Sequence, residues 1–161
     1  MIFTIDIGGT KIAAALFSND GEIVEKKEVG SCIHENLQYL PYLIYDSFWQ
    51  LASKASAIGV ATTGIVLADT VNYLSVRQSL PLQSLLEQQF SKPVFILNDA
   101  SAAALAEYKA ISQKKTIESN TLVYITVSTG IGGGVVQNGT LITSENGFCA
   151  HLGHVTVPTL N

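Results

Sequence analysis

Three short runs of residues carry side chains suited to chemistry on phosphate and hydroxyl groups. Two of the runs are rich in glycine, Asp6-Ile7-Gly8-Gly9-Thr10-Lys11 and Ser128-Thr129-Gly130-Ile131-Gly132-Gly133-Gly134, and the third is Asn98-Asp99. Glycines let consecutive backbone N–H groups point at one oxyanion. A carboxylate can accept the proton of an alcohol whose oxygen attacks phosphorus. The three runs therefore indicate phosphate binding combined with acid–base chemistry.

The first run follows an apolar stretch and reads as a turn between two strands. Thr10 adds a hydroxyl donor to the backbone donors of the turn. Asp6, at the strand end, could hold Mg²⁺ through water, as this hard cation is commonly kept near phosphates. An ordinary hairpin turn is the alternative, because paired glycines are common in turns.

The second run predicts a glycine turn over residues 128–134 in which Thr129 suits a terminal phosphate. It is not a dinucleotide-binding fingerprint, because Val135 stands where a glycine belongs and a strand follows instead of a helix. Small residues favour close approach of a ligand to the backbone, and the glycines concerned are Gly130, Gly132, Gly133 and Gly134. A flexible start to a hairpin is the alternative.

Asn98-Asp99 stands where a predicted strand ends and a helix begins, the usual ligand position of α/β sheets. Asp99 could act as a general base and Asn98 could hold a neighbouring hydroxyl. Capping of the helix is the alternative, and both roles can coexist. His151 and His154 are three residues apart, and hydrogen bonds to a substrate suit them better than a metal site, for which two histidines are too few.

Hydrophobic patterning predicts the elements that must position these side chains. Apolar runs predict strands over residues 2–7, 11–17, 57–61, 94–97 and 122–127, and a hairpin over 134–143 turning at Asn138-Gly139. The hairpin signal Asn19-Asp20-Gly21 and the polar alternation after it predict another strand over 22–29. Apolar spacings of three and four predict helices over 35–55, 81–90 and from Asn98 to about 111. Pro41 falls in the early turns of the first helix or kinks it, and Ser79 could cap the second. Alternating strands and helices indicate an α/β sheet.

A weak internal repeat suggests two similar lobes. Residues 2–24 and 122–142 both read as strand, glycine turn, strand, tight turn and strand. The hydrophilic stretch from Gln113 to Asn120 is the best boundary between lobes. We therefore expect an N-terminal lobe over residues 1–118 and the opening hairpin of a second lobe over 119–161.

Composition narrows the classes of function. The 161 residues include 13 acidic and 9 basic side chains without a basic run, which argues against a nucleic-acid partner. No apolar run approaches the ~18 residues of a membrane span, and no signal peptide is recognisable, so we expect a cytoplasmic protein without a membrane partner. Cys32 and Cys149 lie far apart and suit reduced thiols. A charged fraction of 14% suggests surfaces that another part covers.

Five segments in order, IDIGGTKIAAAL, ATTGIV, NDASAAALAEY, ITVSTGIGGGVV and AHLGH, make the whole chain resemble the ROK sugar kinases of the actin/hexokinase-like superfamily. The resemblance implies an α/β, ribonuclease H-like lobe with a mixed sheet and flanking helices, and a second lobe truncated after its first hairpin. It also implies ATP- and Mg²⁺-dependent phosphorylation of a hexose or hexosamine at its 6-hydroxyl. The likeness is greatest to the bacterial branch that phosphorylates N-acetylmannosamine in sialic-acid catabolism.

The resemblance implies a role for each matching residue. Asp99 matches the catalytic base, Asn98 and Gly64 match sugar contacts, and His154 matches a histidine that touches sugar and ligates zinc in some members. The two phosphate motifs are matched by Asp6, Gly8, Gly9, Thr10 and Lys11, and by Thr129, Gly130, Gly132, Gly133 and Gly134. Ala150-His151 replaces the Gly-Glu of most members, which resembles the variant of the N-acetylmannosamine branch and argues against a general glucokinase.

The family's cysteine cluster, a later sugar-contacting glutamate and its adenosine-binding glycines would follow His154. Because the chain stops at Asn161, we expect zinc not to bind as in the family and the adenine pocket to be absent. A catalytically inactive fragment that binds sugar or a partner chain is therefore the alternative to a competent kinase. A hairpin without covering helices is marginal alone. Its strands should pack on the first lobe or pair with another chain in a homodimer.

Overall fold

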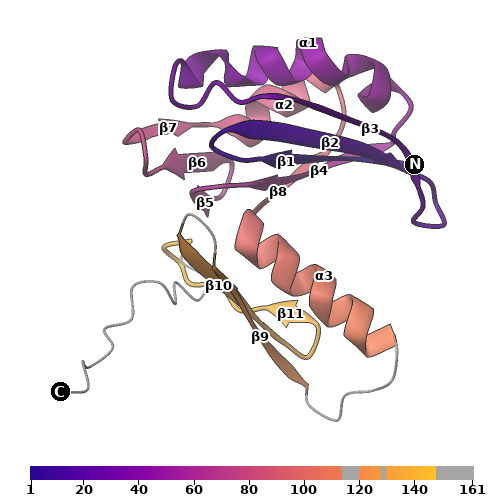
Figure 1. The fold of residues 1–161 in the computed structure, drawn as a ribbon, viewed down its shortest axis with the longest axis vertical. Helices are drawn as coiled ribbons and strands as arrows, with labels where there is room; N and C mark the ends of the chain where they lie inside the picture. The colour runs from indigo at the N-terminus through magenta and orange to yellow at the C-terminus, as the bar shows by residue number, and fades with distance from the viewer. Residues whose placement is uncertain (114–119, 128–129, 148–161) are drawn as a thin grey trace. The chain divides into compact units, whose positions relative to one another are not determined.

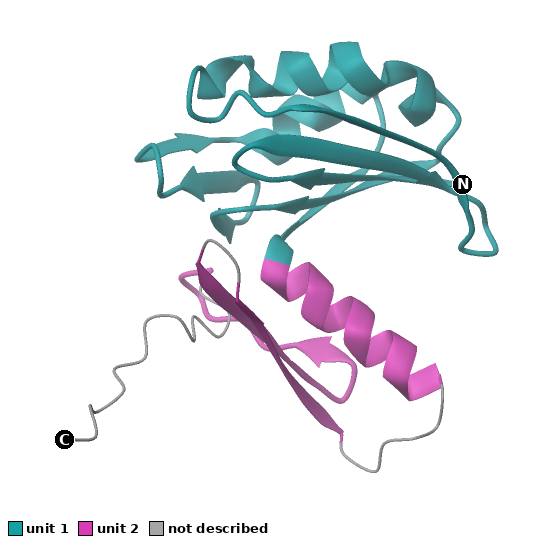
Figure 2. Ribbon diagram, in the orientation of Figure 1, with its two compact units in different colours: residues 1–99 teal, residues 100–161 magenta. Residues whose placement is uncertain are grey.

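The structure is a computed structural model that describes residues 1–113, 120–127 and 130–147. The chain divides into two compact units, Met1–Asp99 and Ala100–Asn161 (Figure 2). The lobe boundary that we predict after residue 118 falls within 114–119, outside the described residues.

The elements follow one another as in Figure 1. In chain order they are β1 (Ile2–Ile7), β2 (Lys11–Phe17), β3 (Ile23–Gly30), the 3₁₀ turn η1 (Leu37–Tyr39), α1 (Leu40–Ser53), β4 (Ala57–Thr62), β5 (Ile65–Leu67), β6 (Thr70–Tyr73), β7 (Gln78–Leu80), α2 (Leu82–Phe90), β8 (Val94–Asn98), α3 (Asp99–Gln113), β9 (Thr121–Val127), β10 (Ile131–Gln137) and β11 (Thr140–Leu141).

Within residues 1–99, all of which are described, five strands form a mixed sheet in the order β3-β2-β1-β4-β8. The first three strands form an antiparallel meander, and β4 and β8 join it as parallel strands. Alternation along β1 buries Phe3, Ile5 and Ile7 on one face, whereas Thr4 and Asp6 lie on the other. The predicted mixed α/β sheet is confirmed.

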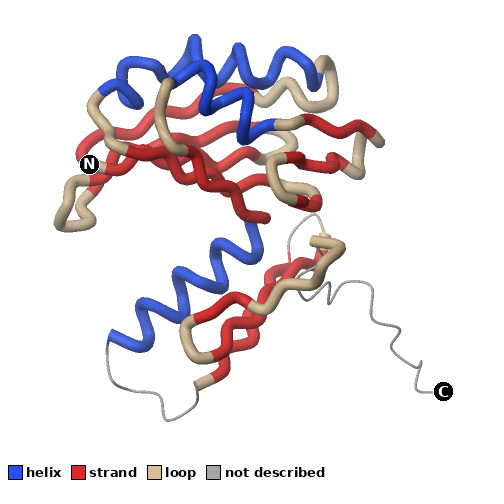
Figure 3. Tube along the Cα trace, turned by 180° about the vertical axis from the view of Figure 1, so that it is seen from behind, coloured by secondary structure: helices blue, strands red, loops and turns tan. Residues whose placement is uncertain are grey.

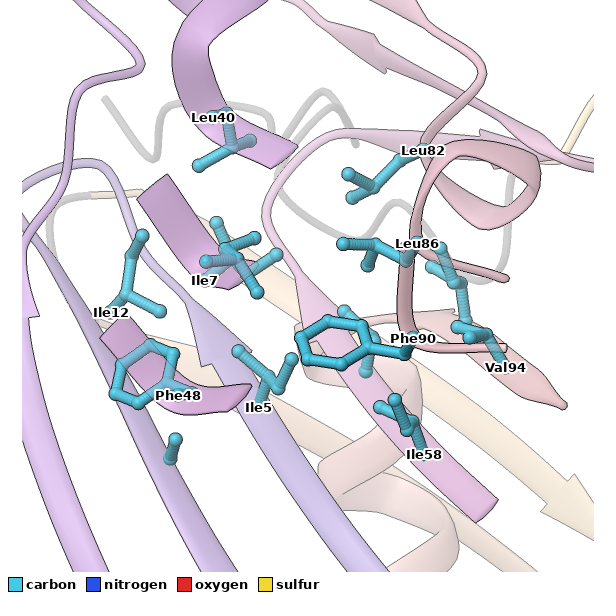
Figure 4. Close-up of a cluster of buried hydrophobic side chains, with 14 of the residues drawn as sticks. Ile5, Ile7, Ile12, Leu40, Phe48, Ile58, Leu82, Leu86, Phe90 and Val94 are labelled. Atoms are coloured by element: carbon cyan, nitrogen blue, oxygen red, sulfur yellow. The ribbon is translucent and has the colours of Figure 1, made fainter. Parts of the chain in front are cut away.

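Helices α1 and α2 lie side by side on one face of this sheet (Figures 1 and 3). In α1 the buried residues Leu40, Ile44 and Phe48 recur every four residues, which forms an apolar stripe. Pro41 lies in the first turn, where its missing N–H costs nothing, so the helix begins later than residue 35. Figure 4 shows the core between helices and sheet, where Phe48, Ile5 and Phe90 are buried together.

A second, three-stranded antiparallel sheet, β5-β6-β7, occupies residues 65–80, for which the sequence pattern predicted no strands. Ser79 lies in β7 and its hydroxyl donates to Asn72 Oδ1 at 2.6 Å. The prediction that Ser79 caps α2 is therefore wrong. Pro81 takes the N-cap position without a side-chain hydrogen bond.

Among the described residues of unit 2, α3 is followed by the antiparallel strands β9, β10 and β11. Asn138 and Gly139 both have positive φ, +51° and +80°, as a type I′ hairpin turn requires. The predicted repeat of an antiparallel meander is confirmed, since β11-β10-β9 has the same pairing pattern as β3-β2-β1.

The predicted glycine turn over residues 128–134 is too long. Strand β10 begins at Ile131 and pairs with β9 over its whole length, so Gly132, Gly133 and Gly134 lie opposite Thr126, Ile125 and Tyr124. Pairing with β9 outweighs the low strand propensity of glycine.

Candidate functional site

The carboxyl ends of the three parallel strands bring the first candidate residues to one edge of the sheet. Ile7 lies opposite Thr62, and Thr62 lies opposite Asn98. Asp6 and Asp99 therefore stand near the ends of strands that have β4 between them, about 10 Å apart by two interstrand spacings. Ligands of α/β sheets commonly bind beyond this edge.

Asp6 lies in an electrostatic setting that favours its protonated form. Partial burial and the negative charge of Asp99 raise the pKa of Asp6, and the positive charge of Lys11 opposes them. The Asp6 carboxylate at this edge suits a hard cation such as Mg²⁺, which keeps several water ligands. The residues thus fit a cation held through water.

The turn between β1 and β2 contains Gly8, Gly9 and Thr10. The Gly8 N–H donates to the Lys11 carbonyl at 2.9 Å, and the Thr10 carbonyl accepts from Ser31 N–H at 3.0 Å. Lys11 forms an exposed ion pair with Glu28 at 3.3 Å on the neighbouring strand β3, an interaction worth little energy.

His34 lies beside the turn between β1 and β2. A Cβ on Gly9 would be 3.3 Å from His34 Nε2, so the ring is close to the backbone of the predicted phosphate turn. The side chain is exposed. Sequence reasoning did not connect it with the turn, because the contact depends on the path of the chain after β3.

Asn98 joins two parts of the site through its side-chain amide. Its Nδ2 donates to the Gly64 carbonyl at 3.0 Å and to Asp99 Oδ1 at 3.0 Å. Asp99 is the first residue of α3, where a negative charge interacts favourably with the helix dipole. Gly64, Asn98 and Asp99, three predicted site residues, are thus linked directly.

The turn after β4 is held by contacts that the sequence does not reveal. The buried hydroxyl of Thr62 lies 3.1 Å from the phenol of Tyr73. Gly64 has a φ of +100°, and a Cβ there would lie 2.6 Å from the Asn72 carbonyl oxygen. Only glycine fits at this position without strain.

Two glycines of the second run contact helix α3. A Cβ on Gly134 would lie 2.6 Å from Ala104 Cβ, and one on Gly132 would lie 3.1 Å from Ala100 Cβ. Residues two apart on one strand share a face, so this face of β10 lets helix α3 approach closely. These glycines therefore have a packing role in unit 2 whatever else they bind.

Four predicted features cannot be placed. Thr129, His151, His154 and Cys149 lie outside the described residues. Among the residues that the structure does describe, no three His, Cys, Asp or Glu side chains gather as a metal site. Nor does that part of the chain contain a helix long and apolar enough to cross a membrane.

Comparison with known proteins decides the family. The sequence profile of the ROK family matches residues 2–161. The chain belongs to the ROK family. Its resemblance to ROK sugar kinases, predicted from five sequence segments, is confirmed.

Named ROK proteins resemble the chain in sequence and fold. The N-acetylmannosamine kinase of Shigella boydii serotype 18 is 40% identical over 155 residues, which are 93% of this chain and 52% of that protein. A ROK glucokinase from Streptomyces griseus, solved with glucose and AMPPNP, superposes with a TM-score of 0.81 at 28% identity, covering 98% of this chain and 51% of its own. A ROK hexokinase from Thermus thermophilus superposes with a TM-score of 0.73 at 33% identity, covering 98% of this chain and 53% of its own.

These similarities place the chain in the actin/hexokinase-like fold of the ROK sugar kinases. The chain spans about half the length of the relatives that it matches.

Proposed function

We propose that this ROK chain carries the catalytic base and the first phosphate turn of an ATP-dependent sugar kinase. The observation that carries the proposal is the position of Asp99 at the carboxyl edge of the parallel strands, hydrogen-bonded to Asn98 and close enough to Asp6 to raise its pKa. The sugar that we propose is a hexosamine, N-acetylmannosamine, phosphorylated at its 6-hydroxyl. A kinase named for this sugar is 40% identical to the chain.

In this mechanism Asp99 accepts the proton of the sugar 6-hydroxyl as the oxygen of that hydroxyl attacks phosphorus. The new oxygen–phosphorus bond forms while the bond to the leaving phosphate breaks. ATP with Mg²⁺, when bound, supplies the phosphoryl group and neutralises the charge that develops on it. Asp6 would hold the cation through water, because its carboxylate lies at the same edge.

The other predicted site residues bind and orient the two substrates. The backbone N–H of Gly9 and the Thr10 hydroxyl donate to phosphate oxygens. Gly8, whose N–H donates to the Lys11 carbonyl, shapes the turn that presents them, and Lys11 adds positive charge beside it. Asn98 and the Gly64 turn hold the sugar. Further along the chain, we propose that Thr129 and Gly130 bind phosphate and that His151 and His154 bind the sugar.

An ADP-release assay with N-acetylmannosamine, N-acetylglucosamine and glucose tests the proposal. We expect turnover by the 161 residues alone to be very low. The ADP release that does depend on sugar should be highest with N-acetylmannosamine and should fall by about 10²–10⁴-fold in Asp99→Asn, as loss of a general base predicts. Asp20→Asn removes an exposed carboxylate from the β2–β3 turn and is the matched control. Equal turnover in Asp99→Asn and the parent chain would remove Asp99 from the mechanism.

The alternative function is a non-catalytic chain that binds sugar or a partner chain. The chain spans about half the length of the relatives that it matches. Saturable sugar binding measured by calorimetry without any ADP release would establish this alternative. Sugar binding that survives Asn98→Ala unchanged would contradict the site proposed here.

We also propose that the hairpin of unit 2 pairs with another chain or packs on another part of the protein. Val123, Ile125 and Val127 alternate along β9, and their side chains are exposed on one face. An apolar face of this kind is normally covered. Light scattering tests the first possibility, since a clean monomer counts against a homodimer.

A further inference from the structure

A buried phenol contacts the carboxyl edge of the main sheet from the small sheet beside it. Tyr73, in β6, is 1% exposed and Thr62, the last residue of β4, is 0% exposed. The two hydroxyl oxygens lie 3.1 Å apart. Buried hydroxyl pairs of this kind are costly to leave incomplete, because each unpaired donor keeps its desolvation penalty.

The direction of this hydrogen bond follows from the number of hydrogens. A threonine hydroxyl has one hydrogen to donate. Thr62 Oγ1 donates it to the Thr63 carbonyl at 3.1 Å, so Tyr73 is the donor to Thr62. Burial raises the pKa of Tyr73 to about 12, so the phenol keeps its proton at neutral pH.

The turn that follows β4 is held by two further backbone contacts. Thr63 N–H donates to the Ile7 carbonyl at 3.1 Å, which fastens the turn to β1. Gly64 lies against the carbonyl of Asn72, the residue before Tyr73 in β6. Strand β6 thus holds the turn with a backbone carbonyl and with a phenol.

The same turn orients the predicted sugar and base residues. The Gly64 carbonyl accepts one hydrogen bond from Asn98 Nδ2, and Asp99 Oδ1 accepts the other. An amide nitrogen carries two hydrogens. We infer that Tyr73 and Thr62 are positioning residues, which hold the 62–64 turn so that its Gly64 carbonyl orients the Asn98 amide and, through it, the Asp99 carboxylate.

This inference rests on the proposed function only in assigning catalytic work to Asn98 and Asp99. The positioning itself can be measured without any substrate. The first readout is the solvent-exchange rate of the Asn98 side-chain amide by NMR in the full 161-residue chain, with the signal assigned by its loss in Asn98→Ser.

Four variants are compared by this measurement. Thr62→Val removes the hydroxyl at nearly constant shape and should speed exchange of the Asn98 amide by up to about tenfold, the equivalent of one lost hydrogen bond. Thr62→Ser keeps the hydroxyl and should restore the parent rate. Tyr73→Phe leaves Thr62 able to donate and should have a smaller effect. Thr4→Val removes a hydroxyl that donates to a backbone carbonyl at 3.3 Å elsewhere in the sheet, and it is the matched control.

An unchanged Asn98 exchange rate in Thr62→Val would overturn the inference, even if the variant melts at a lower temperature. So would equal acceleration in Thr4→Val, because the effect would then be a general loss of stability. Tyr73→Phe, which keeps the size of the side chain, provides a second reading if Thr62→Val does not fold. The inference predicts a measurable acceleration there as well.

The second readout separates this inference from the proposed function. If the chain releases ADP, Thr62→Val should lower kcat about tenfold while the KM for ATP stays within about twofold, because the phosphate turn is untouched. If the parent chain shows neither turnover nor sugar binding, the proposed function fails. The Asn98 exchange rates still decide whether Tyr73 and Thr62 position the amide.

Discussion

Replacing Gly134 with alanine should force helix α3 away from strand β10. The added Cβ would lie 2.6 Å from Ala104 Cβ, whereas carbon atoms in contact are about 3.5–4.0 Å apart, so the helix must move by about 1 Å. It cannot yield by a rotamer change, because the Ala100 carbonyl oxygen and Ser101 Cα lie 3.3 Å from the same position. Overpacking of this kind costs about 1–3 kcal/mol. Because alanine is about 0.5–1 kcal/mol better than glycine within a strand, we expect a net loss of about 1.2 kcal/mol.

Hydrogen exchange read by mass spectrometry is the assay, because it reports each unit separately. Peptides from α3 and β10 should exchange about eightfold faster in Gly134→Ala, the equivalent of that free energy. Trp49 lies in unit 1, and its fluorescence reports the unfolding of that unit. The denaturant concentration at the midpoint of this transition should be the same in Gly134→Ala as in the parent chain. Gly130→Ala is the matched control, since no atom of the described residues lies within 4 Å of its Cβ position.

A compensating substitution tests the geometry directly. Ala104→Gly removes the carbon atom that the new methyl group would meet, so the double variant should recover most of the lost protection despite the helix propensity cost of about 1 kcal/mol. Exchange in Gly134→Ala within about threefold of the parent chain would refute close packing of α3 on β10. A double variant less stable than either single variant would refute the assigned contact.

Three further predictions concern unit 1. Gly64→Ala should lower the free energy of unfolding in urea by about 3–5 kcal/mol, because it adds a clash with β6 to the strain of a φ of +100°. Gly21 has a φ of +85° with open space around its Cβ position, so Gly21→Ala should cost about 1–2 kcal/mol. Equal losses in the two variants would contradict the clash. Burial and the charge of Asp99 raise the pKa of Asp6, so its ionisation lowers the free energy of unfolding as pH rises above 3.8, and Asp6→Asn should be stabilising at neutral pH but not in acid. A pH-independent effect of Asp6→Asn would count against this. An ultraviolet titration should show one phenol that ionises near pH 12 and is missing in Tyr73→Phe. Because the phenol ionises at lower pH in the unfolded chain, the free energy of unfolding should fall as pH rises from 10 toward 12. A titration curve that is the same in Tyr73→Phe as in the parent chain would contradict this assignment.

Hydrophobic periodicity was enough to predict most of the architecture. The alternation of Phe3, Ile5 and Ile7 and the four-residue spacing of Leu40, Ile44 and Phe48 each depend on one buried face, which the sequence displays locally. Strands β5, β6 and β7 were missed because each has only three or four residues, too few for a period to show. Asp6 and Asp99 could be named as candidates from their places at strand ends. Their electrostatic interaction depends on the registers of β1, β4 and β8.

The errors have a common physical cause, because tertiary contacts outweighed local preference. Ser79 is a good capping residue by type, but its hydroxyl bonds to Asn72 within the small sheet. Gly132 and Gly134 favour a turn by propensity, yet strand pairing and the neighbouring helix place them in β10. Tyr73 has no partner within the local sequence, and only the packing of β6 against the end of β4 reveals one.

The mixed sheet has a consequence for the order in which the chain folds. Strands β1, β2 and β3 pair with their neighbours in sequence, whereas the parallel pair β1–β4 brings Ile2 beside Ala57. Contacts distant in sequence are slow to form, because the intervening chain must be closed first. The antiparallel meander is therefore expected to form early and the β4 and β8 pairings late. The edge that carries Asn98 is then assembled only in the last, rate-limiting phase of refolding.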